Sequence, residues 1–92
     1  MKERVMSLKM AIKKPLELNQ PDVGKFIREL RKESGLTQEK FAALLGVTYP
    51  TISRWENGRA QPSPLAMEKL ERQLKRLGKR GQDLLEEYSG VD

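Results

Sequence analysis

The sequence contains no cysteine and no histidine, and each absence removes a class of chemistry. Without cysteine there is no disulfide, and without either residue the usual ligand sets of a zinc site are missing. Histidine is also the commonest general base in enzymes. No group of carboxylates and lysines with the spacing of a catalytic site stands out instead. We therefore expect no enzyme, no metal site and no cofactor.

Aromatic residues and long apolar segments are also scarce. Aromatics make up 5% of the 92 residues and hydrophobic residues 37%, which predicts a small aliphatic core in one compact domain with some additional tail. No apolar run approaches the roughly 20 residues that span a bilayer. The first residues also lack the apolar stretch of a secretory signal peptide. These observations lead us to expect a cytoplasmic protein.

Charge, in contrast, is abundant and unevenly distributed. The chain has 18 basic and 13 acidic residues, a net charge of +5. All 18 basic residues lie within residues 1–80, against nine acidic ones there, which gives this part a net charge of +9. The last twelve residues hold four acids and no base. A basic body with an acidic tail is typical of proteins that bind polyanions, although a lysine-rich solvated surface gives the same count.

From residue 22 onward, apolar residues recur at helical spacing and predict four helices, each opened by a polar cap and closed near a glycine. The pairs of cap and closing residue are Asp22 and Gly35, Thr37 and Gly46, Thr48 and Gly58, and Ser63 and Gly78. The stripes that they bury are predicted to include Val23, Phe26, Ile27, Leu30, Phe41, Ala42, Leu44, Leu45, Ile52, Trp55, Ala66, Leu70, Leu74 and Leu77. Residues 82–88 predict a short fifth helix that docks through Leu84, Leu85 and Tyr88. The predicted fold class is all-α, a compact bundle of four to five short helices.

Residues 1–21 form an extension with a different pattern. Pro15 and Pro21 mark a linker at its end. Apolar and polar residues alternate over residues 6–12, which favours a strand, but a helical interpretation fits nearly as well. A lone strand is not stable in water, so we expect the segment to pair with its symmetry mate or with a neighbouring subunit and so form a homodimer. A mobile tail is the alternative.

The segment from residue 38 to residue 57 carries the strongest indication of function. Two predicted helices are joined here by residues 46–48, a turn too short to let them lie antiparallel, so they must cross steeply. The small Ala42 allows a close approach, and Val47, Ile52 and Trp55 supply apolar contacts that fix the angle. The second helix then projects its outer face in a way that a DNA major groove can accept.

These motifs resemble the Cro/repressor-type helix-turn-helix family, the xenobiotic-response-element class of bacterial and phage transcription regulators. The resemblance covers about residues 23–77, in the motifs Leu36-Thr37-Gln38-Glu39, Phe41-Ala42, Leu45-Gly46-Val47 and Thr51-Ile52-Ser53-Arg54-Trp55-Glu56-Asn57-Gly58. It implies a λ-repressor-like DNA-binding domain over residues 22–80, followed by a short helix and acidic tail over residues 81–92. It further implies a sequence-specific regulator of double-stranded DNA, a repressor and a homodimer, with helix 48–57 in the major groove.

The resemblance also implies roles for single residues. The expected DNA-binding residues are Gln38, Thr48, Tyr49, Pro50, Thr51, Ser53, Arg54, Asn57 and Arg59. Gln38 is expected to hold a phosphate and brace the recognition helix, with a plain helix-opening role as the alternative. Asn57 and Arg59 match positions that contact the DNA backbone; for Asn57 a plain role in ending the helix is the alternative, and the two roles are compatible. Trp55 faces inward, so a core role is expected rather than base stacking.

Two positions on the recognition helix have a more specific interpretation. Arg54 is expected to donate two hydrogen bonds to a guanine, with a phosphate contact as the alternative. Pro50 departs from the polar residues frequent at its position in the family, and with Tyr49 it offers an apolar surface to a thymine methyl group.

Arg31, on the first predicted helix, matches a family position that pairs with the glutamate at the end of the recognition helix. Here that glutamate is Glu56, and a partly buried ion pair is expected.

Two other functions remain open from the sequence. Antitoxins often use this fold with an added segment that binds a toxin, and residues 1–20 or the acidic tail are candidates for such a segment. The other alternative is a coactivator domain that binds protein and little DNA. The basic run of the fourth helix and its end is either a second phosphate surface or a solvated face; it comprises Lys69, Arg72, Lys75, Arg76, Lys79 and Arg80.

Overall fold

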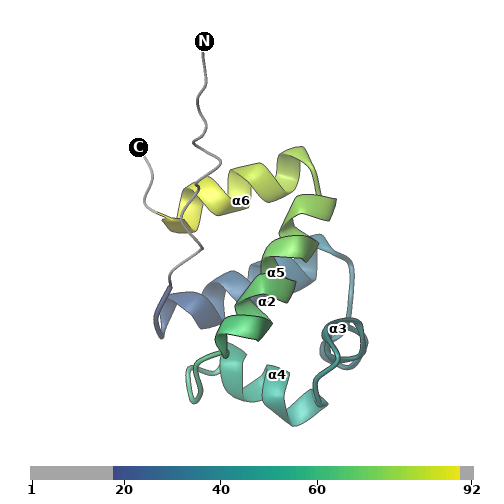
Figure 1. The fold of residues 1–92 in the computed structure, drawn as a ribbon, viewed down its shortest axis with the longest axis vertical. Helices are drawn as coiled ribbons and strands as arrows, with labels where there is room; N and C mark the ends of the chain where they lie inside the picture. Colours follow the sequence, from purple (N-terminus) through teal and green to yellow (C-terminus); the bar gives the residue numbers. More distant parts are fainter. Residues whose placement is uncertain (1–17, 90–92) are drawn as a thin grey trace.

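The computed structural model describes residues 18–89, which fold into five α-helices. The helices are α2 (Asp22–Glu33), α3 (Gln38–Leu45), α4 (Tyr49–Glu56), α5 (Pro64–Arg76) and α6 (Lys79–Ser89). The described residues contain no strand. In Figure 1, α5 runs between α6 and α4, and α3 lies to one side. The all-α fold class predicted from the sequence is therefore confirmed. The predicted strand at residues 6–12 and the end of the acidic tail lie outside the described residues.

Local capping explains most of the helix boundaries. The Thr37 hydroxyl accepts a hydrogen bond from the Lys40 backbone N–H, and the Ser63 hydroxyl accepts one from Ala66. Both side chains satisfy an N–H group that the first turn of a helix leaves without an intrahelical partner, as the sequence predicts.

Of the other two predicted caps, Asp22 is wrong and Thr48 is confirmed in position but not in its side-chain bond. Pro21 occupies the N-cap position of α2, so Asp22 is the first helical residue and the chain enters the helix one position earlier than expected. Thr48 does stand at the N-cap of α4, but its side chain makes no cap hydrogen bond. Its hydroxyl is 2.9 Å from that of Thr51 instead, because two neighbouring hydroxyl groups satisfy each other.

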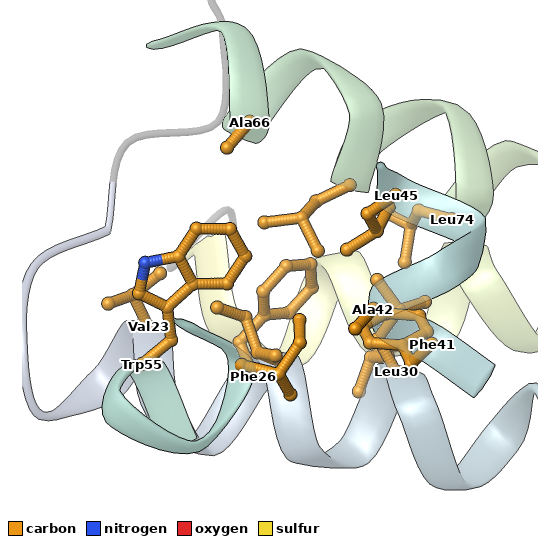
Figure 2. Close-up of a cluster of buried hydrophobic side chains, with 13 residues drawn as sticks. Val23, Phe26, Leu30, Phe41, Ala42, Leu45, Trp55, Ala66 and Leu74 are labelled. Atoms are coloured by element: carbon orange, nitrogen blue, oxygen red, sulfur yellow. The ribbon is translucent and has the colours of Figure 1, made fainter. Parts of the chain in front are cut away.

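The core consists of the apolar stripes of all five helices (Figure 2). Its fully buried members include Phe26, Ile27, Phe41, Ile52 and Leu70. In Figure 2, Trp55 and Val23 lie at one end of the cluster and Phe41 with Leu45 at the other. One prediction fails, since Leu44 is 44% exposed on the outer face of α3. An eight-residue helix buries a narrower stripe than the sequence prediction assigned to it.

The last helix is longer than predicted and belongs to the same core. It begins at Lys79 rather than at residue 82, and it buries Leu84 and partly buries Tyr88. The Tyr88 ring packs edge-on against Phe26 of α2, with 5.7 Å between the ring centroids. Gly81 lies so close to α5 that a Cβ there would stand 1.9 Å from the Leu74 carbonyl oxygen. This contact explains why a residue with poor helix propensity is inside the helix.

Residues 18–20, placed in the extension by the sequence prediction, pack on the helical body. Leu18 covers part of the core, and its carbonyl accepts a hydrogen bond from the Gln61 side chain. The division of the chain at residue 21 stays a prediction. None of the helices in the described part of the chain has the length and apolar character that crossing a membrane requires.

Candidate nucleic-acid interface

The turn between α3 and α4 sets the angle of the two helices. Gly46 has φ 73°, a left-handed conformation that glycine adopts without a Cβ clash. The Val47 N–H donates to the Ala42 carbonyl at 2.9 Å, and the Gly46 N–H donates to Ala43 at 3.2 Å. These two bonds close the end of α3 and turn the chain at once into α4. The Lys69 ammonium group of α5 also donates to the Leu45 carbonyl at 3.1 Å.

The inner face of α4 is fixed by burial. Ile52 is fully buried, Trp55 is 5% exposed, and the side chain of Glu56 has no exposed surface. The predicted core role of Trp55 is therefore confirmed (Figure 2). Because these three residues face the body, the opposite side of the helix faces outward.

The outer face of α4 carries a connected row of polar groups. The Thr48 and Thr51 hydroxyls are 2.9 Å apart, and Arg54 Nη2 lies 3.5 Å from the Thr51 hydroxyl. Residues three apart are neighbours on a helix surface, so this row runs along the helix axis. Tyr49 and Pro50 are exposed beside it, at the first turn. Five predicted DNA-binding residues thus lie together on one accessible face.

The end of α4 and the turn after it hold three more of the predicted residues. Asn57 and Arg59 are exposed, and the Asn57 side chain donates to the Ser53 hydroxyl at 3.3 Å. The Arg59 N–H donates to the Arg54 carbonyl at 2.8 Å, which closes the helix. The side chains of Asn57 and Arg59 therefore stand at a hydrogen-bonded turn that follows the outer face.

A network of hydrogen bonds joins α4 to α2 and α3 beneath this face. Arg31 Nε donates to Glu56 Oε2 at 2.6 Å, and its Nη2 donates to Glu56 Oε1 at 3.0 Å. Gln38 Nε2 donates to Glu56 Oε1, also at 3.0 Å. Arg31 makes a further bond to the Leu36 carbonyl at 3.2 Å. The two residues expected to pair, Arg31 and Glu56, thus form a two-pronged ion pair that Gln38 joins.

The electrostatics of Glu56 follow from this network. Burial alone raises the pKa of a carboxyl group, because desolvation disfavours the charged form. For Glu56, the hydrogen bonds from Arg31, Gln38 and Arg28 and the charge of Arg31 outweigh burial, so its pKa lies below the ordinary value. The hydrogen bond to Glu56 likewise raises the pKa of Arg31. The ion pair is therefore fully charged at neutral pH.

Sequence reasoning missed two residues at this site. Arg28 Nε lies 3.5 Å from Glu56 Oε1, and its side chain is 45% exposed. Its position one turn before Arg31 on α2 was a signal for it. Gln20 is the second, and its side chain bonds to residues 35 and 40 positions away along the chain. No local sequence pattern predicts contacts between residues so far apart in the chain.

The basic run of α5 and the start of α6, interpreted from the sequence as either a second phosphate surface or a solvated face, is partly engaged within the protein. Lys69 bonds to α3 as described, Lys79 lies 3.1 Å from Asp83, and Arg80 lies 3.5 Å from Glu33. Because half of the run has these partners, it is a weaker phosphate surface than its charge count predicts. The outer face of α4 is the stronger candidate for contacting a nucleic acid.

Comparisons with known proteins agree with this geometry. A family model described as helix-turn-helix matches residues 27–77, more than half of the chain. The matched segment contains α3, the turn and α4 in full. No solved structure matches the chain.

Three relatives are similar to part of the chain. An HTH-type transcriptional regulator of Methanothermobacter thermautotrophicus, itself uncharacterized, is 50% identical over 50 residues, which cover 54% of this chain and 72% of that protein. A candidate multi-protein-binding factor 1 of Yarrowia lipolytica is 40% identical over 52 residues, 56% of this chain and 34% of that protein. The antitoxin PezA of Streptococcus pneumoniae is 44% identical over 41 residues, 45% of this chain and 26% of that protein.

The chain spans only about a third and a quarter of the last two relatives, so their likeness concerns one segment of longer proteins. The family model covers more than half of this chain, and the match to the first relative covers 72% of that protein, which is enough to assign the family. The chain belongs to the Cro/repressor-type helix-turn-helix family of transcription regulators.

Proposed function

We propose that the protein is a sequence-specific double-stranded-DNA-binding transcription regulator that inserts α4 into the major groove. The observation that carries the proposal is the division of α4 into two faces. Ile52, Trp55 and Glu56 fix the inner face, and a row of exposed polar and cationic groups is left outside. A helix-turn-helix protein reads the major groove with such a helix, fixed on its inner face and presented outward. Family membership gives the proposal its second support.

Within this proposal Arg54 reads a base. Arg54 is exposed in the last turn of α4, and its guanidinium lies next to Thr51. Arginine recognises guanine by donating two hydrogen bonds to the O6 and N7 atoms. Tyr49 and Pro50, at the start of the same face, offer apolar surface to a thymine methyl group.

Phosphate contacts then fix the register of the helix in the groove. We assign them to Gln38, Asn57 and Arg59. The Gln38 amide already bonds to Glu56 through Nε2, and an amide nitrogen carries a second N–H that remains for a phosphate oxygen. The net charge of +9 on residues 1–80 favours association with DNA of any sequence.

We further propose that the regulator is a repressor and a homodimer. Two copies of α4 then read half-sites about 34–36 Å apart, one turn of the double helix. The proposal involves no catalysis and no cofactor, and it places the protein in the cytoplasm, with the DNA that it controls.

Selection of bound duplexes from a random DNA pool tests the proposal. We expect enrichment of one short motif, present twice with half-sites about 10–10.5 base pairs apart if two subunits bind. Folding of the sample is checked by circular dichroism before the selection. A folded protein that enriches no motif, or binds every duplex equally, contradicts the proposal.

A second candidate function is that of an antitoxin, favoured by the likeness to the S. pneumoniae antitoxin. In that case the helix-turn-helix domain controls its own operon, and a segment outside it binds a toxin. Purification of the chain from its native cells distinguishes the two functions. A stoichiometric small protein that inhibits growth when it is expressed alone supports the antitoxin function, and recovery of the chain by itself contradicts it.

A further inference from the structure

Gln20 precedes α2 and forms three hydrogen bonds with its side chain. Nε2 donates to the Trp55 carbonyl at 3.0 Å and to the Ala60 carbonyl at 2.5 Å. Oε1 accepts a hydrogen bond from the Gly24 N–H at 3.1 Å. One half-buried amide therefore connects the start of α2, the end of α4 and the loop after α4.

Each of these backbone groups lies at a helix end or in a loop. The Gly24 N–H is in the first turn of α2, where N–H groups have no intrahelical partner. The Trp55 carbonyl is in the last turn of α4, where it also accepts the Gly58 N–H at 3.2 Å. Ala60 lies beyond that turn, in the loop that leads to α5. Gln20 thus supplies hydrogen bonds that the helices themselves cannot.

The backbones of α2 and α4 also meet at this point. A Cβ on Gly24 would stand 2.5 Å from the Trp55 carbonyl oxygen and 3.2 Å from that of Glu56. The end of α4 is therefore attached to the body in two separate ways. The Glu56 side chain binds Arg31, and the neighbouring Trp55 carbonyl binds Gln20.

We propose that Gln20 is a positioning residue that fixes the end of α4 and the turn carrying Asn57 and Arg59. This inference rests on the proposed function, because position matters there for the fit of α4 in the groove. Gln20 itself does not contact DNA in this account. A hydrogen bond from Gln61 Nε2 to the Leu18 carbonyl at 2.7 Å also holds residues 18–20 against the loop between α4 and α5.

The inference predicts a specific pattern of loss. Base reading by Arg54 and phosphate contacts by Asn57 and Arg59 must be made together, so a loosened helix end weakens them together. Binding to random DNA depends mainly on net charge, which an uncharged substitution at position 20 leaves unchanged. Loss of Gln20 should therefore reduce specificity more than it reduces total affinity.

Three variants of the full chain separate the contributions of the side chain. Gln20→Met keeps the length and apolar part but removes all three hydrogen bonds. Gln20→Glu keeps the acceptor for Gly24 but loses both donors. Gln82→Met is the matched control for Gln20→Met, because it makes the same uncharged change at an exposed position of α6, where the Gln82 side chain donates to Glu86 of the same helix. If Gln20→Met does not fold, Gln20→Asn replaces it, since its shorter side chain cannot reach both carbonyls.

The first measurement is backbone amide exchange without DNA. We expect the Gly58 and Arg59 amides to exchange about tenfold faster in Gln20→Met and Gln20→Glu. Loss of the hydrogen bonds from Gln20 makes local opening of the end of α4 about ten times more frequent. In Gln20→Glu the Gly24 amide should keep its protection. Unchanged exchange at residues 58 and 59 in both variants overturns the inference.

The second measurement compares affinity for the selected duplex with affinity for random DNA. We expect about a tenfold loss on the selected duplex and less than about a twofold change on random DNA for Gln20→Met, with Gln82→Met close to wild type on both. Equal losses on both DNAs overturn the positioning role. If the wild-type protein selects no sequence, the proposed function fails, while amide exchange still decides whether Gln20 fixes the end of α4.

Discussion

Replacement of Glu56 by glutamine is the most informative perturbation of stability. The carboxylate is fully buried and accepts hydrogen bonds from Arg31, Gln38 and Arg28. Glu56→Gln keeps the shape and one acceptor but removes the negative charge. The Arg31 guanidinium, 16% exposed, then remains largely buried without its counter-charge.

The magnitude follows from the geometry. Breaking a buried ion pair by removing one partner costs about 3–5 kcal/mol. We expect about 3 kcal/mol, the lower end, because Arg31 is slightly exposed and the glutamine oxygen still accepts one hydrogen bond. Arg28 adds little to this sum, since its side chain is nearly half exposed and screened by solvent. For a domain of this size the expected fall in Tm is about 12–24 °C.

Thermal and urea denaturation followed by circular dichroism measure this loss. Glu87→Gln serves as the matched control, because it makes the same change at an exposed position and should alter stability by less than about 0.5 kcal/mol. A Tm for Glu56→Gln equal to that of the control would show that the pair of Arg31 and Glu56 adds no stability, because a buried and paired carboxylate cannot be neutralised without cost.

Three further predictions concern pH, packing and assembly. Pairing lowers the folded-state pKa of Glu56, so its contribution is complete above the unfolded-state pKa of about 4.3 and is lost as the pH falls through the lower folded-state value. The difference in unfolding free energy between wild type and Glu56→Gln should therefore narrow below about pH 4 in urea titrations, and a constant difference speaks against the pairing. Gly81→Ala should destabilise the protein by at least about 2 kcal/mol, because its Cβ would clash with the Leu74 carbonyl; an unchanged urea midpoint rejects the packing of α6 on α5. Deletion of residues 1–17 should convert the expected dimer to a monomer in sedimentation experiments, and a dimer that survives rules out this segment as the interface.

Local signals in the sequence located most of the helices. Thr37 and Ser63 are caps in the structure because each hydroxyl accepts a hydrogen bond from the free N–H three residues later. The start of α6 escaped prediction because Gly81 disfavours a helix locally, and only its contact with Leu74 makes it suitable. Thr48 stands at the N-cap of α4 as predicted, but its hydroxyl bonds to that of Thr51 and not to a free N–H of the helix.

The candidate site was predictable to different depths. The outward face of α4 followed from the inward spacing of Ile52 and Trp55, which requires only helix geometry. The pairing of Arg31 with Glu56 came from the family resemblance alone. The role of Gln20 could not be predicted from helix geometry or from the family resemblance. Its partners are far away in the sequence, and they are backbone carbonyls, which every residue type has.

The most direct test of the central claim, that the outer face of α4 reads DNA bases, is the binding of Arg54→Ala. Its affinity is compared with wild type on the selected duplex, on duplexes with single base-pair changes and on random DNA, over a range of salt concentrations. We expect Arg54→Ala to lose its preference at one base pair, worth about 1–3 kcal/mol, and to keep its preferences elsewhere. An equal loss on every duplex, with a salt slope reduced by about one unit, would show a phosphate contact and contradict base reading by Arg54.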